Sequence, residues 1–165
     1  MPTPTYEPIT TFTTTGSQTA VSLVGLTGYK HLMIECVFSS PGGAGMYVIP
    51  NSNTTNNGIR NDFMWTYSGG GAPNELIQDN TGYTYINPGG NLAANLQGIT
   101  RIHIFNASST STFKAYYIET SWESNFNHGY GWGTLHTTNA IDQFTIASGT
   151  NWSSGSKFTC FGLVG

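Results

Sequence analysis

The sequence predicts an all-β protein, an antiparallel β-sandwich or jelly roll built as a single domain. Short runs of alternating apolar and polar residues recur along the 165-residue chain, and turn-forming residues separate them. No long segment shows the 3.6-residue period of an amphipathic helix. Aromatic residues make up 13% of the chain and 21 glycines accompany them, a composition typical of short strands joined by tight turns.

The N-terminal half begins with residues 1–15, which are rich in threonine and proline. They predict an extended arm or an edge strand, since proline is confined to sheet edges and strand starts. Such an arm either reaches a neighbouring subunit or packs along its own domain, and both alternatives stay open. Residues 16–165 are expected to form the sandwich. In its first half we expect strands at Gln18–Val24, Gly28–Phe38, Met46–Pro50 and Ile59–Tyr67.

The second half is less regular. Residues 72–98 are the least readable segment, and Leu92–Leu96 within them has the composition of one helical turn. The aromatic and glycine-rich stretch 122–138 is expected to be mainly loop. We expect strands at Tyr83–Ile86, Ile99–Phe105, Thr112–Thr120 and Ala140–Ile146, the middle two forming a hairpin.

Two strands are expected to form the centre of the sandwich. In Gly28–Phe38, alternation places four apolar residues on one face: Leu32, Ile34, Cys36 and Phe38. At the C-terminal end, a polar turn at Ser153–Ser156 precedes the most apolar strand of the chain. Its alternation places Phe158, Cys160 and Gly162 on one face. We expect this last strand to be buried in a sheet.

The same two segments carry a family resemblance. The run Tyr29-Lys30-His31-Leu32, followed by an alternating strand, resembles a motif in small virion proteins of tailed phages, especially cyanophages and other marine phages. In that family the far end reads as a turn, Gly-Ser, an aromatic or aliphatic strand and a terminal Tyr-Gly-Ile. Gly155-Ser156, Phe158 and Phe161-Gly162-Leu163 occupy the matching places, although Phe161 stands where tyrosine is common and Val164-Gly165 extends past the usual end.

Ala140–Ile146 is also similar to the family's penultimate strand, so that the resemblance covers roughly a third of the chain. It implies a jelly-roll-like sandwich, often assembled as a trimer, in a phage particle. The composition alone also allows an immunoglobulin-like sandwich.

Cys36 and Cys160 are the only cysteines. They either join the two central strands in a disulfide or remain buried free thiols that behave as small apolar residues. Free thiols are favoured, because the N-terminus lacks the charged and apolar regions of a signal peptide. We therefore expect synthesis in a host cytoplasm.

Charge is scarce in this sequence. Charged residues are 8% of the chain, against roughly 25% in ordinary globular proteins, and the net charge is −3. The five lysines and arginines are scattered and make no basic footprint, which argues against nucleic acid as a partner. No apolar run approaches the roughly 18 residues of a membrane span. A neutral polar surface has little electrostatic repulsion against close packing with other copies.

No arrangement typical of catalysis stands out. The histidines lack a nucleophile elbow or a local metal-ligand spacing, so no catalytic residue, cofactor or metal site is predicted. Glu119 and Glu123 are near enough in sequence to be considered as a glycosidase pair, but a solvated rim explains them better. We expect the protein not to be an enzyme.

Two functions remain. The first is a capsid decoration (cement) protein on the outer shell of a virion, a homotrimer that binds the major capsid protein. The second is a tail-fibre or tail-tip domain that binds host surface glycan, since aromatic faces and neutral amides suit carbohydrate. The alternative role for the same aromatics is to fill the core or a trimer interface. The candidate glycan or interface surface consists of Trp122, Asn125, Asn127, His128, Tyr130 and Trp132.

Overall fold

The computed structural model describes residues 5–39, 46–51, 59–67, 74–75, 78–81, 84–85, 97–123 and 127–164. Side chains are described for these residues except between 59 and 85 and at positions 122 and 127. This part of the chain is all β, as the sequence predicts. Its strands are β1 (Glu7–Thr13), β2 (Ala20–Val24), β3 (His31–Ser39), β4 (Met46–Pro50), β5 (Ile59–Tyr67), β6 (Asn74–Glu75), β7 (Gln78–Thr81), β8 (Thr84–Tyr85), β9 (Gln97–Ile104), β10 (Lys114–Trp122), β11 (Asn127–Leu135), β12 (Gln143–Ser148) and β13 (Lys157–Leu163).

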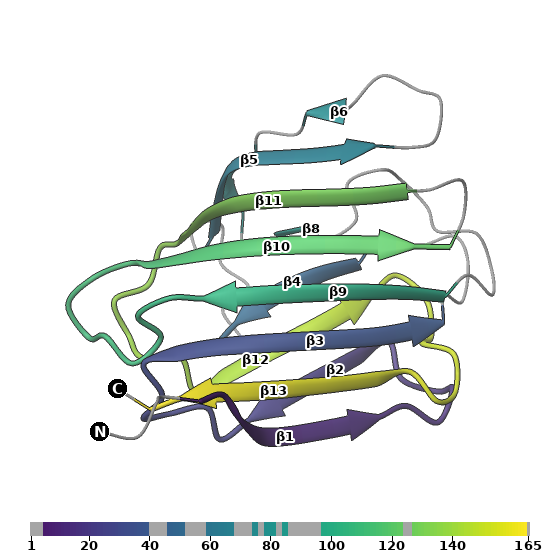
Figure 1. Ribbon diagram of the computed structural model, residues 1–165, viewed down its shortest axis with the longest axis horizontal. Coiled ribbons are helices and arrows are strands. Elements are labelled where there is room, and N and C mark those ends of the chain that lie inside the picture. Colours follow the sequence, from purple (N-terminus) through teal and green to yellow (C-terminus); the bar gives the residue numbers. More distant parts are fainter. Residues whose placement is uncertain are drawn as a thin grey trace.

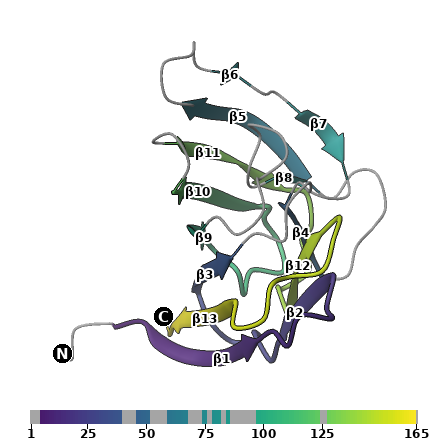
Figure 2. The same cartoon turned by 90° about the vertical axis from the view of Figure 1, so that its right-hand side faces the viewer.

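The strands form two antiparallel sheets that pack face to face. The larger sheet has the order β1-β13-β3-β9-β10-β11-β5-β6, with β7 also beside β5, and the smaller has the order β2-β12-β4-β8. The large sheet faces the viewer in Figure 1 and the small sheet lies behind its lower half, while Figure 2 shows the two layers from the side. The predicted antiparallel β-sandwich is therefore confirmed.

The strand pairing is nested. β1 pairs with β13, β2 with β12, β3 with β9 and β4 with β8. The chain also alternates between the sheets, since β1 and β3 belong to the large sheet and β2 and β4 to the small one. A long hairpin rolled up in this way is a jelly roll. The hairpin β10–β11 and the segment β5–β7 extend the large sheet beyond β9.

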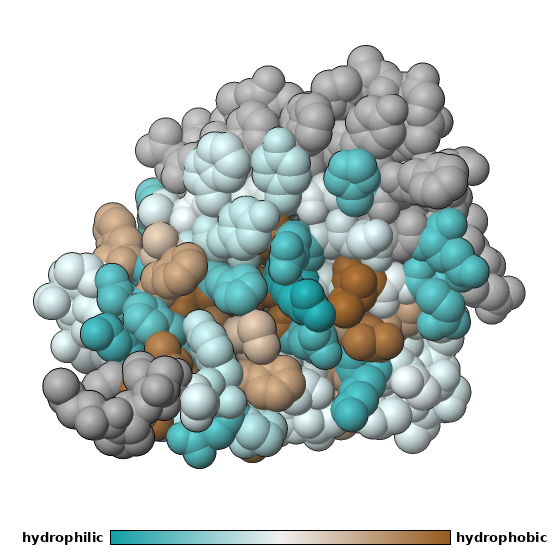
Figure 3. Space-filling view, viewed as in Figure 1, coloured by the Kyte–Doolittle hydropathy of each residue, from teal (hydrophilic) through white to brown (hydrophobic). Residues whose placement is uncertain are grey.

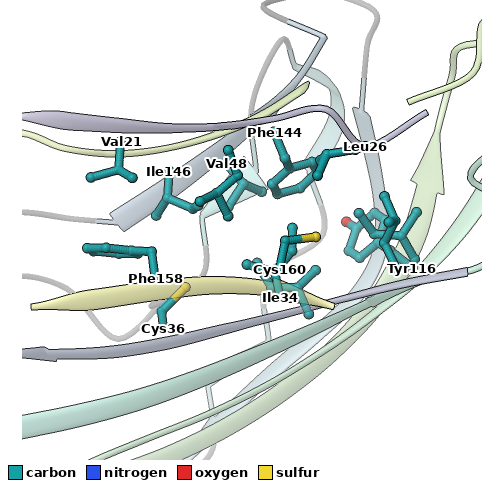
Figure 4. Close-up of a cluster of buried hydrophobic side chains, with 14 of the residues drawn as sticks. Val21, Leu26, Ile34, Cys36, Val48, Tyr116, Phe144, Ile146, Phe158 and Cys160 are labelled. Atoms are coloured by element: carbon teal, nitrogen blue, oxygen red, sulfur yellow. The ribbon is translucent and has the colours of Figure 1, made fainter. Parts of the chain in front are cut away.

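The core lies between the sheets and depends on the two central strands. The inward residues of β3 are at most 1% exposed, and Phe158 and Cys160 of β13 are fully buried. Figure 4 shows these side chains pointing toward Val21, Val48 and Ile146 of the small sheet. The predicted alternation of both strands is confirmed.

Trp152 closes the core beside β13. Its ring is fully buried, and it meets Phe38 and Phe158 edge-on at centroid distances of 5.9 and 4.9 Å. Its backbone N–H donates to the carbonyl of Gln18, 2.7 Å away, which joins the β12–β13 loop to the segment before β2. The loop is thereby held at the end of the sheet.

The N-terminal segment packs on its own domain. β1 is an edge strand of the large sheet and pairs with β13, with a register shift between Pro8 and Thr10. After it, the Thr14 N–H donates to the Ser156 carbonyl at 2.9 Å. Of the two alternatives for residues 1–15, the edge strand holds for Glu7–Thr13.

One predicted segment is wrong. β11 is a nine-residue strand, whereas 122–138 was expected to be mainly loop. Gly129, Gly131 and Gly133 alternate on its buried face. Glycine has a low β-propensity and supplies no apolar side chain. The alternation of apolar and polar residues that usually indicates a strand is therefore missing from this segment. The expected helical turn at Leu92–Leu96 lies outside the described residues.

The two cysteines are free and buried, so the alternative of a disulfide is ruled out in this structure. Burial raises the pKa of both thiols, that of Cys160 to about 12. Because the thiolate is the reactive form, roughly one Cys160 in ten thousand is reactive at pH 8.

We predict that Ellman's reagent at pH 8 leaves the native protein unlabelled and labels two thiols after unfolding in guanidinium chloride. An exposed thiol introduced by Thr138→Cys serves as the positive control, since Thr138 lies on the surface. Rapid labelling of two thiols in the native wild-type protein would contradict the buried placement of β3 and β13.

Candidate binding face

The candidate site is the outer face of the large sheet, the face turned away from the small sheet. Antiparallel register aligns its side chains in rows that cross the strands. Two rows cross β3, β9, β10 and β11 in that order: Glu35, Arg101, Glu119 and Tyr130; and Met33, His103, Tyr117 and Trp132. Figure 3 views this face and shows hydrophilic residues gathered over its central strands.

Arg101 lies between two carboxylates in the first row. Its Nε is 3.0 Å from the Glu35 carboxylate, and its Nη1 is 3.9 Å from that of Glu119. The three side chains are 29–46% exposed, so water screens these ion pairs. The guanidinium is compensated by two anions, and the cluster as a whole carries a negative charge.

A hollow of about 340 Å³ opens beside this cluster, over β9, β10 and β11. Burial raises the pKa of Tyr117 first, and the nearby Glu119 and Tyr130 raise it further. Its hydroxyl therefore keeps its proton well above neutral pH and can donate a hydrogen bond. The lining residues are Ile99, Arg101, Tyr117, Glu119, Thr120, Ser121, His128, Gly129 and Tyr130.

Three of the six residues that the sequence predicted as a binding surface lie together on the outer face of the large sheet, and two of them, His128 and Tyr130, line the hollow. His128, Tyr130 and Trp132 alternate along β11 on the outer face, and Trp132 is 45% exposed. Positions 122 and 127 pair with each other at the end of the β10–β11 hairpin. Their side chains, and all of Asn125, lie outside the described residues.

Sequence reasoning missed the partners of these three residues. Tyr117, Arg101 and Glu35 each alternate correctly within a predicted strand. What places them together is the register of β3 with β9 and of β9 with β10, which brings Arg101 to Glu35, 66 positions away. The alternation of Thr112–Thr120 was the available signal, since it puts Tyr117 and Glu119 on one face.

The other candidate groups have structural partners. His31 accepts a hydrogen bond at Nδ1 from the Asn106 N–H at 3.3 Å, and burial lowers its pKa. His136 bonds the Thr134 hydroxyl at 3.0 Å and stacks on Phe113. Within the described ranges, no group of three or more His, Cys, Asp or Glu residues is placed to hold a metal ion.

Glu119 and Glu123 do not line the same hollow. Glu119 belongs to the one just described, whereas Glu123 lines an adjacent one with Val37 and Gln97 and accepts from the Gln97 N–H. Four residues of extended strand span about 13 Å, whereas glycosidase carboxyl groups lie roughly 5–10 Å apart. The described geometry does not bring the two carboxyl groups together as such a pair.

Lys114 fixes the hairpin that carries the site. It is fully buried, and its Nζ donates to the carbonyls of Ser109, Thr112 and Thr137 at 2.7, 3.2 and 2.9 Å. Burial lowers its pKa, while the three carbonyls solvate its ammonium group in place of water. Lys114 thus ties the β9–β10 loop to the segment that follows β11.

Comparison with protein-family models and with curated proteins found no match. Among solved structures, an endo-β-1,4-glucuronan lyase from the fungus Trichoderma reesei matches with a TM-score of 0.21 at 9% identity, covering 97% of this chain and 85% of the lyase. Alginate lyase vAL-1 from Chlorella virus matches with a TM-score of 0.18 at 11% identity, covering 74% and 84%. Scores this low carry no argument about this protein. No helix in the described part of the chain is long and apolar enough to cross a membrane.

We predict that two basic residues of this region differ sharply in their effect on stability. Arg101→Gln should lower the free energy of unfolding by less than about 1 kcal/mol, because its ion pairs are exposed. Lys114→Met should lower it by about 2–4 kcal/mol, because three partly buried carbonyls lose the charged donor that they share. Guanidinium denaturation measures both, with Lys157→Met as a control on an exposed lysine. An equal loss in the free energy of unfolding for the two variants would contradict the buried placement of Lys114.

Proposed function

We propose that the protein is a structural component of a tailed-phage virion, namely a decoration protein that sits on the outer capsid surface and strengthens contacts between capsid subunits. Its partners are then the major capsid protein and further copies of itself, arranged as a homotrimer. The role is mechanical and involves no cofactor and no catalysis.

One observation carries this proposal. The two segments that resemble the virion family, separated by more than a hundred residues, are neighbours in space, because β3 pairs with β13 along seven residues. Tyr29 of the first segment lies against Gly162 of the second, where an added Cβ would overlap the tyrosine ring. The tyrosine and the glycine that belong to the resemblance thus pack directly against each other, which is a physical reason for the two to occur together.

The surface chemistry supports the same role. With 8% charged residues, copies of this domain repel one another weakly. A specific stable interface buries on the order of 1,600 Å², and three copies about one axis convert weak capsid contacts into avidity. A neutral β-sandwich with rigid sheets is suited to such close packing.

We predict that antibody labelling of purified virions shows the protein distributed over the icosahedral shell. Particles that lack it should assemble but lose DNA at a lower temperature than complete particles, because contacts between capsid subunits are weaker. Purified protein added back should restore the original release temperature. Labelling confined to the tail would overturn the decoration role and favour the second candidate.

The second candidate is a tail-fibre or tail-tip domain that binds host surface glycan. The hollow over β9–β11 favours it, because Tyr117 and Tyr130 supply aromatic rings beside Ser121, Glu119 and His128. Sugars bind through C–H faces on aromatic rings and through hydroxyls to polar side chains.

Under the second candidate, we predict that the isolated protein binds a glycan array and that Trp132→Ala weakens this binding at least tenfold. Trp132 pairs with Tyr117, which lines the hollow, whereas the matched control Phe113→Ala changes an exposed aromatic (53%) that precedes β10 and stacks on His136. Circular dichroism should show that both variants keep the fold. An array without any signal would remove the second candidate and leave the capsid role unaffected.

A further inference from the structure

The outer face holds two more hollows besides the one over β9–β11, and the three are contiguous. The second, about 340 Å³, shares Ile99 and Ser121 with the first. The third, about 490 Å³, lies over β1, β13 and β3 and shares Val37 with the second. The shared residues place the three hollows one after another across the sheet from β1 to β11, and the three together are hereafter called the cross-strand groove.

The register explains the floor of this groove. One row of paired residues crosses the sheet along it: Lys157, Val37, Ile99, Ser121 and His128. This row crosses five strands, from β13 to β11, and the third hollow extends the groove to a sixth strand, β1, through Pro8 and Thr11. With about 4.8 Å between strands, the groove is roughly 24 Å long. That length exceeds a single sugar ring and matches a short stretch of a polymer.

The walls combine apolar and hydroxyl-bearing groups. Val37, 44% exposed, and Ile99 form the apolar middle. Thr11 and Thr159 present a hydroxyl pair 3.1 Å apart at the β1 end, and Tyr117 and Tyr130 line the β11 end. Alternating C–H surface and hydroxyl partners suit a chain of pyranose rings.

The charges of the groove select among such chains. Besides His128, Tyr117 and Tyr130, the ionisable lining residues are three carboxylates, Glu35, Glu119 and Glu123, and two cations, Arg101 and Lys157. Arg101 is already held by Glu35 and Glu119. Of these two cations, Lys157 alone has no carboxylate partner within ion-pair distance among the described residues. A polyanion would meet a net negative wall, whereas neutral hydroxyls can donate to the carboxylates.

We propose that the cross-strand groove binds an internal stretch of a linear, neutral polysaccharide. The inference rests on the second candidate function and deepens it, by giving the ligand a length and a charge. The polymer crosses the strands, with one end of the bound stretch on Tyr117 and Tyr130 and the other beside Thr11, Thr159 and Phe161 of the β1–β13 end.

The test uses the full chain and oligosaccharides of one to six units from three neutral series, β-glucans, mannans and galactans, together with oligouronates of equal length. Isothermal titration calorimetry measures each affinity. For at least one neutral series the affinity should rise tenfold or more from two units to five, then level off as the groove fills. The oligouronates should bind at least tenfold more weakly.

Two variants probe the two ends of the groove. Tyr130→Ala should weaken long and short oligomers alike by tenfold or more. Phe161→Ala should weaken only oligomers of four or more units, because shorter ones do not reach β13. Lys157→Gln tests the charge assignment through its effect on the oligouronates, and Phe113→Ala is the control outside the groove. Denaturation midpoints establish that each variant is folded.

Each outcome decides a separate point. Length-independent binding would overturn the extended groove and leave a single-sugar site, hence the second candidate, in place. Tighter binding of oligouronates, weakened by Lys157→Gln, would overturn the assignment to a neutral polymer. Absence of binding to all series would overturn the groove proposal, while the glycan array decides the second candidate and virion labelling decides the decoration role.

Discussion

The pairing of β3 with β13 is the constraint on which the rest of the structure depends. It joins the first third of the chain to its end through seven paired residues, from Lys157 opposite Val37 to Leu163 opposite His31. Closing so long a loop costs conformational entropy, which the burial of the inward side chains of both strands must offset. Each fully buried Phe, Leu or Ile contributes roughly 1.5–3 kcal/mol toward that end. Once the pair has formed, β1 and β9 have edges to join, and the nested order of the jelly roll follows.

The same pairing gives the two faces of the large sheet different chemical character. Alternation sends Ile34, Cys36 and Cys160 inward, where they meet the small sheet (Figure 4), and leaves Glu35 and Thr159 outward. In the described part of the large sheet no second layer covers the outer face, so its residues are free of the demand for apolar packing. This face carries the charged residues Glu35, Arg101 and Glu119, which form ion pairs with one another.

Much of this fold could be predicted from local pattern, and the failures have physical causes. β3 and β13 were predictable because their apolar residues alternate without interruption. β11 was not, because glycine at 129, 131 and 133 erases the apolar half of the pattern while leaving the strand intact. The candidate binding face could be predicted only in part, for a different reason. His128, Tyr130 and Trp132 share a face through the period of a single strand, whereas Arg101 reaches Glu35 through a register between distant strands that no local pattern encodes.

The two proposed roles can occupy one molecule only if they use different surfaces, and the sandwich has them. A polysaccharide in the cross-strand groove would cover the outer face of the large sheet, so capsid contacts would need the opposite layer. The outer face of the small sheet has the expected character: Val24 is 55% exposed there, and the Ser22 and Thr145 hydroxyls bond across strands at 3.0 Å. The described outward residues of β2, β4 and β12 carry no charge, so their close contact with a partner imposes little desolvation cost. A sandwich attached to a shell through its small sheet would then present its groove outward.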